Sequence, residues 1–409
     1  MTPAERGQSP LRYRDFRLLW AGFFVSQVGT QMQVVAVAWQ VYQLTGDPLA
    51  LGAIGLARVL PVIVLGIFGG LFADLVDRRR LLLATQSAMM ACSLGLFLLT
   101  HTGRVTMPAL YLFCFAAGTA TALSNPARQA MIPSLVPESV LARALGLSVS
   151  SWQLATVLGP TVGGILLGSH GAAVVYLLDA VSFLAMILAL LLIRPRGSAA
   201  PETAPGLEAL REGFRFLWRT PILLALMAAD FLGTFFAGAM LLMPIFANEL
   251  LHVGPRGLGF LFAAPALGSM LVALAIALRG PPPLAGSTVL WCIGLYGLAI
   301  AAFGATESFG AALFFLVVSG AADGASTVVR QTLRQLLTPD HLRGRMTGVT
   351  MVFFMGGPQL GEIEAGALAR FVGVRMSVIV GGLLCTLSAA AMAVAVPALR
   401  RYRLQGPAR

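Results

Sequence analysis

The chain contains no lysine, and few of its 409 residues carry a charge. Aspartate, glutamate and arginine together make up 11% of the sequence, whereas hydrophobic residues make up 57%. This composition leaves too little polar surface to cover a soluble globular protein of this length. The sequence therefore predicts a protein that lies in a lipid bilayer.

Residue patterns that support several other functions are also missing. There is no GxxxxGK[ST] loop to bind a nucleotide phosphate, and no nucleophile stands in a recognisable arrangement with a base. The four cysteines lie inside apolar runs, without a CxxC or other metal-ligand spacing. We therefore expect no enzymatic activity, no metal and no cofactor.

Twelve apolar runs are long enough to cross a bilayer, which takes about 20 helical residues. They lie at residues 16–43, 50–73, 81–101, 107–127, 144–168, 172–193, 221–247, 256–278, 286–305, 309–329, 345–369 and 375–396. We expect an all-α polytopic membrane protein whose twelve transmembrane helices form two pseudo-symmetric six-helix bundles.

A polar segment at residues 194–220 separates the two halves, and its prolines and charges exclude a membrane span. We expect residues 1–193 to form the N-terminal bundle, 194–220 a cytoplasmic linker and 221–409 the C-terminal bundle. Leu207, Leu210, Phe214 and Leu217 recur at helical spacing between charged residues, which predicts an amphipathic helix along the inner membrane surface. A solvated connector is the alternative.

The 28 arginines produce a formal net charge of +11, but their placement argues against nucleic-acid binding. Twenty-three of them lie in the amino-terminal segment, alternate loops and the carboxyl tail. This distribution follows the positive-inside rule, so we expect a bacterial inner-membrane protein with both termini in the cytoplasm. The arginines would then contact anionic lipid rather than nucleic acid.

Two stretches half a protein apart are near copies of each other. Arg128-Gln129, Pro137-Glu138, Arg143 and Gly146 recur 202 positions later as Arg330-Gln331, Pro339-Asp340, Arg345 and Gly348. Gly159-Pro160 and Gly163 recur 198 positions later as Gly357-Pro358 and Gly361. The difference between the two offsets is about one helical turn. Duplicated halves of long apolar helices are typical of alternating-access transporters.

The loop between the second and third spans combines an acid with clustered arginines. Its residues that match the signature G-x-L-A-D-R-x-G-R-R are Gly70, Phe72, Ala73, Asp74, Arg78 and Arg79. In this loop the chain resembles the major facilitator superfamily, from which it departs at Leu75 and Asp77. The resemblance implies that the loop stabilises one face of the transport cycle. A plain positive-inside loop is the alternative.

The fifth span resembles the exporter signature of the same superfamily, G-x8-G-x3-G-P-x2-G-G. The matching residues are Gly146, Gly159, Pro160, Gly163 and Gly164, with Ala155 in place of one glycine. Small residues allow helices to approach closely in lipid, and the proline kinks the helix. The resemblance implies an antiporter, and generic helix packing is the alternative.

Three further segments, Gly29–Met32, Asn125–Gln129 and Leu178–Phe183, resemble the branch that contains enterobactin exporters, macrolide efflux proteins and transmembrane secretion effectors. This resemblance implies a monomeric secondary active exporter that expels a small amphiphilic or lipophilic compound, drug or siderophore-like, in exchange for protons. Two alternatives remain: an importer or uniporter of the same fold, and a non-transporting membrane sensor or lipid-handling scaffold.

Three aspartates inside predicted spans are candidates for proton coupling, because ionisable groups are costly to bury in lipid. Asp230 is the first choice, since helix rise places it about 15 Å into the seventh span. Desolvation favours the neutral form of a carboxylate, which would let it bind and release a proton. Asp323 comes second. For Asp179, on a supporting helix, a structural hydrogen-bonding role is favoured, and a buried aspartate satisfied by hydroxyls is the alternative for Asp230.

Charged residues near the ends of spans are candidates for gating. We expect Arg58 and Glu362 to form an ion pair on the outer side that breaks when the outer gate opens, with Glu364 as an alternative partner. Arg128 and Arg330 end the fourth and tenth spans, where each can cap helix carbonyls or pair with the nearby acid, Glu138 or Asp340. A structural latch is favoured over substrate binding for these two arginines.

Superfamily geometry places helices one, four, seven and ten around a central cavity. The residues that these helices would offer to a substrate are Gln27, Gln31, Phe113, Phe231, Phe235, Met240, Met243 and Phe314. Aromatic and methionine side chains with few polar groups suit an amphiphilic or lipophilic ligand. For any single residue of this set, lipid-facing packing is the alternative.

Overall fold

The structure is a computed structural model that describes residues 9–73, 77–194, 207–238, 240–279, 285–339 and 342–402. The regular secondary structure in these ranges is helical. These ranges contain no β-strand. The helices are η2 (Pro10–Arg12), α1 (Arg14–Thr45), α2 (Pro48–Ala73), α3 (Arg78–His101), α4 (Met107–Leu135), α5 (Glu138–His170), α6 (Ala172–Leu192), α7 (Leu207–Arg219), α8 (Pro221–Phe236), η3 (Met240–Leu242), α9 (Met243–Ile245), η4 (Phe246–Leu250), α10 (Gly254–Arg279), α11 (Ala285–Ala305), α12 (Phe309–Leu337), α13 (Arg343–Val372), α14 (Val374–Ala395) and α15 (Pro397–Arg401). The prediction of an all-α protein is confirmed.

Eight helical segments in the described ranges are long and apolar enough to cross a membrane. They are α3, α4, α6, the run Pro221–Leu250, α10, α11, α12 and α14. The four remaining predicted spans coincide with α1, α2, α5 and α13. Three of these are long helices, with 32 residues in α1, 33 in α5 and 30 in α13. Helices therefore cover every span that the apolar runs predict.

The seventh span is interrupted. α8 ends at Phe236, and helical structure resumes at Met240 with the short helices η3 and α9 and the π-helix η4. At the interruption, a Cβ atom added to Gly238 would lie 2.7 Å from the carbonyl carbon of Gly361, closer than side-chain carbons approach backbone. The backbone of this segment thus lies directly against α13, and glycine makes that contact possible.

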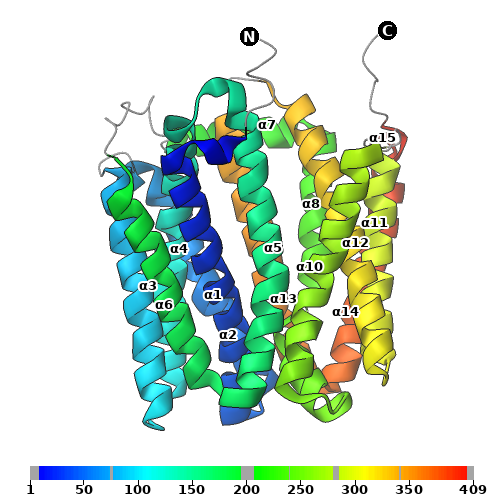
Figure 1. Ribbon diagram of the computed structural model, residues 1–409. Helices are drawn as coiled ribbons and strands as arrows, with labels where there is room; N and C mark the ends of the chain where they lie inside the picture. The colour runs from blue at the N-terminus through cyan, green and yellow to red at the C-terminus, as the bar shows by residue number, and fades with distance from the viewer. Residues whose placement is uncertain are drawn as a thin grey trace. The chain divides into compact units, whose positions relative to one another are not determined.

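The chain forms two compact units, which Figure 1 shows coloured along the sequence. Unit 1 consists of Met1–Gln40 and Leu60–Ala204, and unit 2 of Val41–Val59 and Pro205–Arg409. The division after Ala204 falls within the segment expected to link the halves. The end of α1 and the first half of α2 belong to unit 2, so the units are not simply the two halves of the sequence.

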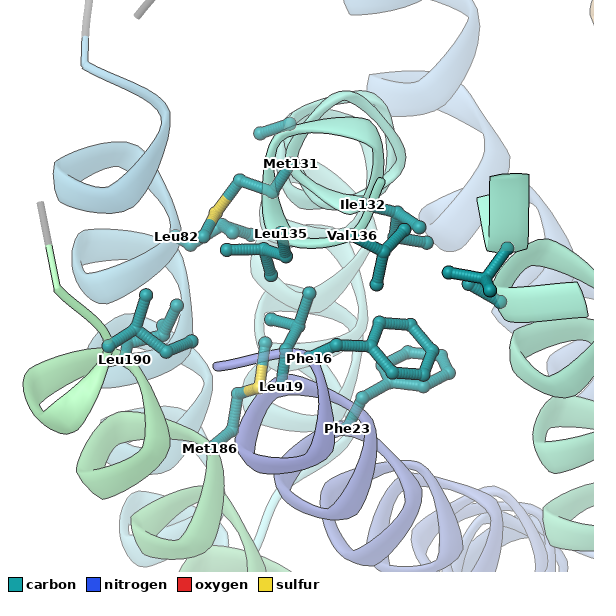
Figure 2. Packing of buried hydrophobic residues seen from close by; sticks show 14 residues of the cluster. Phe16, Leu19, Phe23, Leu82, Met131, Ile132, Leu135, Val136, Met186 and Leu190 are labelled. Carbon is teal, nitrogen blue, oxygen red and sulfur yellow. The ribbon is translucent and has the colours of Figure 1, made fainter. Parts of the chain in front are cut away.

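In unit 1, a core of buried apolar side chains joins α1 to its neighbours (Figure 2). Phe16, Leu19 and Phe23 of α1 pack among residues of α3, α4, α5 and α6. The other buried members of this cluster are Leu82, Ala127, Met131, Ile132, Leu135, Val136, Val140, Ala144, Met186, Leu190 and Ile193. Because side chains from five helices interlock here, the core sets the register of α1 within the unit.

The helix arrangement around α3 in unit 1 recurs around α11 in unit 2. α3 packs against α4 and α6, and α11 packs against α12 and α14. Since α11, α12 and α14 contain the ninth, tenth and twelfth predicted spans, these are the duplicated counterparts of the third, fourth and sixth. The doubled sequence therefore folds into a doubled packing pattern.

The repeated glycines make equivalent contacts in the two units. In unit 1, Gly159 of α5 lies against Gln31 and the Val28 carbonyl of α1, and Gly163 lies against Met32. A Cβ added to Gly159 would come within 2.8 Å of the Val28 oxygen, and one added to Gly163 within 2.9 Å of the Met32 Cα. The exporter signature thus forms a close α5–α1 contact.

In unit 2, α13 contacts α8 in the same manner. Gly357 lies against Thr234 and Phe231, and Gly361 against Phe235. A Cβ added to Gly357 would lie 3.3 Å from the Phe231 carbonyl oxygen. Val28 and Gln31 therefore correspond in packing to Phe231 and Thr234, at an offset of 203 positions.

The helix expected near the linker is α7, which packs against α13 and α8. Gly213 and Leu217 are buried, whereas Arg211, Arg215 and Trp218 are exposed. Positions 213 and 217 lie on one helical face, and 211, 215 and 218 on the opposite face. α7 is therefore amphipathic, with its small and apolar face toward unit 2.

Replacing Gly159 with alanine is expected to destabilise the protein, because the new methyl group would overlap Gln31 and the Val28 carbonyl. Overpacking of this kind costs about 1–3 kcal/mol in unfolding free energy. Gly146, in the same helix and signature, has nothing within 4 Å of an added Cβ, so Gly146→Ala serves as the matched control and should be neutral or stabilising. Thermal unfolding in detergent measures both, and equal melting temperatures for the two variants would contradict the packing role.

Candidate functional site

In unit 2, α8 and α12 bring two of the predicted residues into contact. Nη2 of Arg330 lies 2.7 Å from Oδ1 of Asp230, and the two side chains are only 10% and 15% exposed. The same nitrogen donates a hydrogen bond to Oγ1 of Thr327 at 2.9 Å. This is a charge-assisted hydrogen bond within a largely buried ion pair.

A second carboxylate stands beside this pair. Asp323 Oδ1 is 3.6 Å from Arg330 Nη2, and its side chain is 40% exposed. Asp323, Thr327 and Arg330 follow one another at i, i+4 and i+7 and therefore share one face of α12. We call Asp230, Asp323, Thr327 and Arg330 the ion cluster. The spacing of Asp323, Thr327 and Arg330 was a signal in the sequence that these three residues share a helical face. It gave no signal that Arg330 pairs with Asp230.

The two duplicated arginines have different surroundings. Asp340, one expected partner of Arg330, lies outside the described residues. In unit 1, the guanidinium carbon of Arg128 lies 3.8 Å from the centroid of the Phe23 ring, a cation–π contact. Within the described residues, Arg128 Nε has no hydrogen-bond partner, and no ion pair joins Arg128 to Glu138. Each arginine therefore contacts residues of its own unit, Arg128 in unit 1 and Arg330 in unit 2.

Asp179 lies at one end of a polar chain that links three helices of unit 1. Its side chain is fully buried, and Oδ2 accepts a hydrogen bond of 2.6 Å from Ser93 Oγ. Ser93 in turn accepts a hydrogen bond of 3.0 Å from Gln33 Nε2. The chain therefore connects α1, α3 and α6. The other carboxylate oxygen, Oδ1, has no hydrogen-bond partner within the described residues and faces Gly29 of α1.

A second polar link joins the same three helices seven residues along α1 and α3. Gln40 Nε2 donates to Thr100 Oγ1 at 3.1 Å, and Tyr176 OH donates to Gln40 Oε1 at 2.8 Å. Glutamines at positions 33 and 40 lie about 10 Å apart along the helix axis. Sequence reasoning identified Asp179 but missed these partners, although Gln33, Gln40, Ser93 and Thr100 share the seven-residue spacing.

The loop signature places its arginines against the ends of neighbouring helices. Arg78 Nη1 donates to the Ala130 carbonyl of α4 at 3.0 Å. Arg79 donates to the carbonyls of Leu190 and Leu191, at 2.7 and 3.0 Å, in the last turn of α6. These carbonyls of α6 have no partner in their own helix, so arginine satisfies them.

The departure from the signature at position 77 has a local structural role. Asp77 is the N-cap of α3, and its Oδ1 accepts a hydrogen bond of 2.9 Å from the Arg80 backbone N–H. Gly70 lies in the last turn of α2. Asp74, the acid of the signature, lies outside the described residues.

The exporter-signature residues fall into two groups. Gly159, Pro160, Gly163 and Gly164 are buried in α5, and Gly159 and Gly163 make the close contacts with α1 described above. Gly146 is exposed near the start of the helix. The signature therefore contributes packing at its second half only.

The expected outer-side pair does not form a contact of ion-pair length. The described residues contain no N···O distance within 4.0 Å between Arg58 and Glu362, although the Arg58 charge acts on Glu362. Glu362 Oε2 instead lies against Gly55 of α2, and the Glu362 carbonyl lies against Gly52. Glu364 is two residues along α13 and so faces another direction. The Arg58–Glu362 pairing stays a prediction.

The segment of α1 and α2 that belongs to unit 2 makes a further polar contact. Tyr42 OH donates to Glu249 Oε1 at 2.9 Å and accepts from Asn248 Nδ2 at 2.8 Å. Asn248 and Glu249 lie in the π-helix η4, a type of local distortion that is frequent at functional sites. The sequence contained no signal for this contact, because a π-helix does not follow the helical periodicity on which the prediction depended.

The residues expected to line a cavity are found on α1 (Gln27, Gln31), α4 (Phe113), α8 (Phe231, Phe235), η3 (Met240), α9 (Met243) and α12 (Phe314). The rings of Phe231 and Phe235 stack with centroids 5.9 Å apart. Met243 is only 1% exposed and lies in the core of unit 2, whereas Phe314 is exposed. Their role toward a substrate stays a prediction.

Comparison with known proteins identifies relatives along nearly the whole chain. The family model described as "Transmembrane secretion effector" matches residues 6–405. The chain is 27% identical over 386 residues to the multidrug efflux pump Tap of Mycolicibacterium fortuitum, covering 91% of this chain and 92% of that protein. It is 26% identical over 394 residues to the enterobactin exporter EntS of Salmonella choleraesuis strain SC-B67, covering 96% and 94%.

Solved structures show the same fold. The crystal structure of a bacterial homologue of the human lysosomal transporter Spinster, in an inward-facing and unoccupied conformation, superposes with a TM-score of 0.75 at 18% identity. The match covers 98% of this chain and 100% of that one. A bacterial homologue of the iron transporter ferroportin, also inward-facing, matches with a TM-score of 0.72 at 17% identity and covers 94% and 99%. The expected twelve-helix fold is confirmed by these matches.

Removing one partner of the buried ion pair should be destabilising. Asp230→Ala removes the hydrogen-bonded acid of Arg330 and leaves Asp323, at 3.6 Å, as its remaining partner, so the unfolding free energy should fall by about 1–3 kcal/mol, and the double variant Asp230→Ala/Arg330→Met should recover part of the loss. The control is Glu307→Ala, since the Glu307–Arg375 pair at 3.0 Å is 77% and 36% exposed and contributes about 1 kcal/mol or less. Thermal unfolding decides, and a single variant no less stable than the control would contradict the pairing.

The chain of hydrogen bonds through Asp179 predicts a second stability difference. Ser93→Ala removes the donor to a fully buried carboxylate and the acceptor for Gln33, so the unfolding free energy should fall by about 1–3 kcal/mol. Ser150→Ala is the control, because exposed Ser150 bonds only the Gly146 carbonyl of its own helix. If both serine variants melt at the same temperature, the polar chain does not join α1, α3 and α6 energetically.

Proposed function

Because the chain belongs to the transmembrane secretion effector family of the major facilitator superfamily, we propose that it is a secondary active exporter of a small amphiphilic or lipophilic compound, driven by proton antiport. The family consists of membrane transporters rather than enzymes, and the protein is a multi-pass inner-membrane protein. Export is supported by two relatives that each match more than nine-tenths of this chain, one a multidrug efflux pump and the other an enterobactin exporter.

The ion cluster is the observation that carries the proposal of proton coupling. Two carboxylates and one guanidinium lie together on helices long and apolar enough to cross a membrane. Charges in such helices are costly, and where they occur they mark ion pathways and proton relays. The cluster holds two carboxylates within 4.0 Å of one guanidinium, and the charge of Arg334, one turn further along α12, also acts on Asp230. It therefore supports a proton-binding role better than a purely structural one.

Alternating access is the proposed transport mechanism, and the contacts of the segment Val41–Val59 support it. The Tyr42–Glu249 hydrogen bond and the close packing of Gly52 and Gly55 against Glu362 hold this segment in unit 2. In the proposed cycle these contacts are on the outer side and separate when that side opens. The orientation follows the arginine distribution, with both termini in the cytoplasm.

Under this proposal the transporting unit is a single chain. Its partners are the exported compound, protons and the surrounding lipid, and nucleic acid is not among them. Phe231 and Phe235, whose rings stack on α8, and the glutamines of α1 are the proposed contacts for the compound. Aromatic surfaces accept ligands of varied shape with modest demands on hydrogen bonding.

A vesicle experiment tests the function directly. Purified protein is reconstituted into liposomes with an acidic lumen, and uptake of ethidium, erythromycin and enterobactin is followed. A gradient of one pH unit, about 1.4 kcal/mol, should support about tenfold accumulation of a transported probe when one proton is exchanged. Nigericin, which collapses the gradient, should abolish it.

The control is protein-free liposomes, which correct for passive partitioning of each probe. Equilibration of a probe through the protein without dependence on the gradient would indicate a uniporter and contradict antiport. Movement of none of the three probes would contradict the proposed substrate class.

A further inference from the structure

Arg128 of unit 1 carries a charge that no acid balances within the described residues. Its side chain is half-buried, its Nε atom is buried without a hydrogen-bond partner, and no carboxylate oxygen in these residues lies within 4.0 Å of it. A guanidinium stays protonated in proteins, so it cannot avoid the cost of burial by losing its proton. A buried charge of this kind is unfavourable until another group pairs with it.

The contact with Phe23 offsets part of this cost but uses none of the N–H groups. The guanidinium carbon of Arg128 lies 3.8 Å from the centroid of the Phe23 ring, and Phe23 is only 9% exposed. The ring meets the face of the planar guanidinium and attracts its charge. The N–H donors point along the edges of the group, where they match the paired oxygens of a carboxylate or phosphate.

The duplicated arginine of unit 2 shows which groups balance such a charge. Arg330 lies 2.7 Å from Asp230 and 3.6 Å from Asp323. At the matching positions unit 1 has Gln27, 203 residues before Asp230, and Thr121, 202 residues before Asp323. The first offset is that of the repeated glycine contacts, and the second is that of the two arginines. Unit 2 therefore supplies its own carboxylates, whereas unit 1 has neutral side chains in their place.

Two amide side chains lie beside the contact between Arg128 and Phe23. Gln27 follows Phe23 by four residues on α1, and Asn125 precedes Arg128 by three on α4, so each amide shares a helical face with one member of the contact. As the first and fourth spans, α1 and α4 run in opposite directions, which places both amides on the same side of the contact. Within the described residues, neither amide donates a hydrogen bond. An anion held by Arg128 would have neutral donors next to it.

We propose that Arg128 binds an anionic oxygen group, such as a carboxylate, of the exported compound, with Gln27 and Asn125 as supporting donors. The ligand then supplies the negative charge that Asp230 and Asp323 supply to the duplicated arginine. The exported compound is accordingly an amphiphile that carries such a group. This inference rests on the proposed export function and names a substrate class within it.

Thermal unfolding of the purified protein in detergent, with two probes that share one ring system, tests the site. Pyrenebutyrate carries a carboxylate that is ionised at neutral pH, and pyrenebutanol carries a hydroxyl in its place. Affinities follow from the rise in melting temperature with probe concentration. The wild type should bind pyrenebutyrate about ten- to hundredfold more tightly than pyrenebutanol, as expected for hydrogen bonds to a charged group.

The variants assign that preference to one residue. Arg128→Gln should abolish it, Arg128→Lys should keep part of it, and the control Arg104→Gln, at an exposed arginine, should leave it unchanged. The comparison of the two probes in the wild type and in Arg128→Lys keeps the proposal testable if Arg128→Gln does not fold. No preference in the wild type, or a preference that persists in Arg128→Gln, overturns the proposal.

The melting temperature without a probe distinguishes a binding site from a structural latch. Arg128→Met removes the charge and keeps a flexible apolar side chain against Phe23. Because the charge has no balancing acid, this variant should melt at the wild-type temperature or above it. A lower melting temperature would show that the guanidinium stabilises the fold as a latch, which contradicts the proposal.

Further outcomes separate the exported compound from lipid and this inference from the export function. If dihexanoyl phosphatidylglycerol stabilises the wild type through Arg128 and pyrenebutyrate does not, the anion is a lipid headgroup and the assignment is wrong. Vesicle transport of the three probes without an Arg128-dependent preference for pyrenebutyrate overturns this inference alone. Binding of pyrenebutyrate through Arg128 in a protein that moves no probe overturns export instead.

Discussion

Close backbone contact between helices is the constraint on which both units depend. Lipid chains are as apolar as the helix surfaces, so helices in a membrane gain little from the hydrophobic effect and associate through packing at short range. Gly159 and Gly163 bring α5 onto α1, and Gly357 and Gly361 bring α13 onto α8. These contacts position α8, and with it Asp230, beside α12. A side chain at any of the four glycines would move the two helices of its own contact apart, and at Gly357 or Gly361 it would also loosen the ion cluster.

The sequence predicted the helices and their duplication well, because both depend on local composition and spacing. Apolar runs predicted the spans. The copy of Gly159-Pro160 in the second half of the chain indicated that a helix contact is repeated. The sequence did not predict the Asp230 partner of Arg330, because Asp340 is far closer along the chain and was the acid expected to pair with it. Tertiary packing brings residues 230 and 330 together, and no periodicity encodes that. The break after Phe236 was also missed, since apolar composition continues through it.

Polar groups inside unit 1 and unit 2 serve different ends. Gln33 donates to Ser93 and Ser93 donates to the Asp179 carboxylate, so three helices are joined by neutral donors. In unit 2 a guanidinium holds the acids, and the balance of charge depends on protonation. Buried hydrogen-bonded networks specify a unique arrangement when their members are satisfied, whereas the cost of a buried charged cluster depends on the pairing of its charges.

The packing correspondence of Val28 and Gln31 with Phe231 and Thr234 aligns Gln27 with Asp230. The offset that aligns the two arginines places Thr121 opposite Asp323. The duplicated arginine is retained at position 128, where it lies over the Phe23 ring instead of beside an acid. The two units therefore keep the same helix packing but differ in the side chains at matching positions. Under the proposed antiport, the positions of unit 1 that match Asp230 and Asp323 carry no acid, so they add no proton site and are free to diverge in what they recognise.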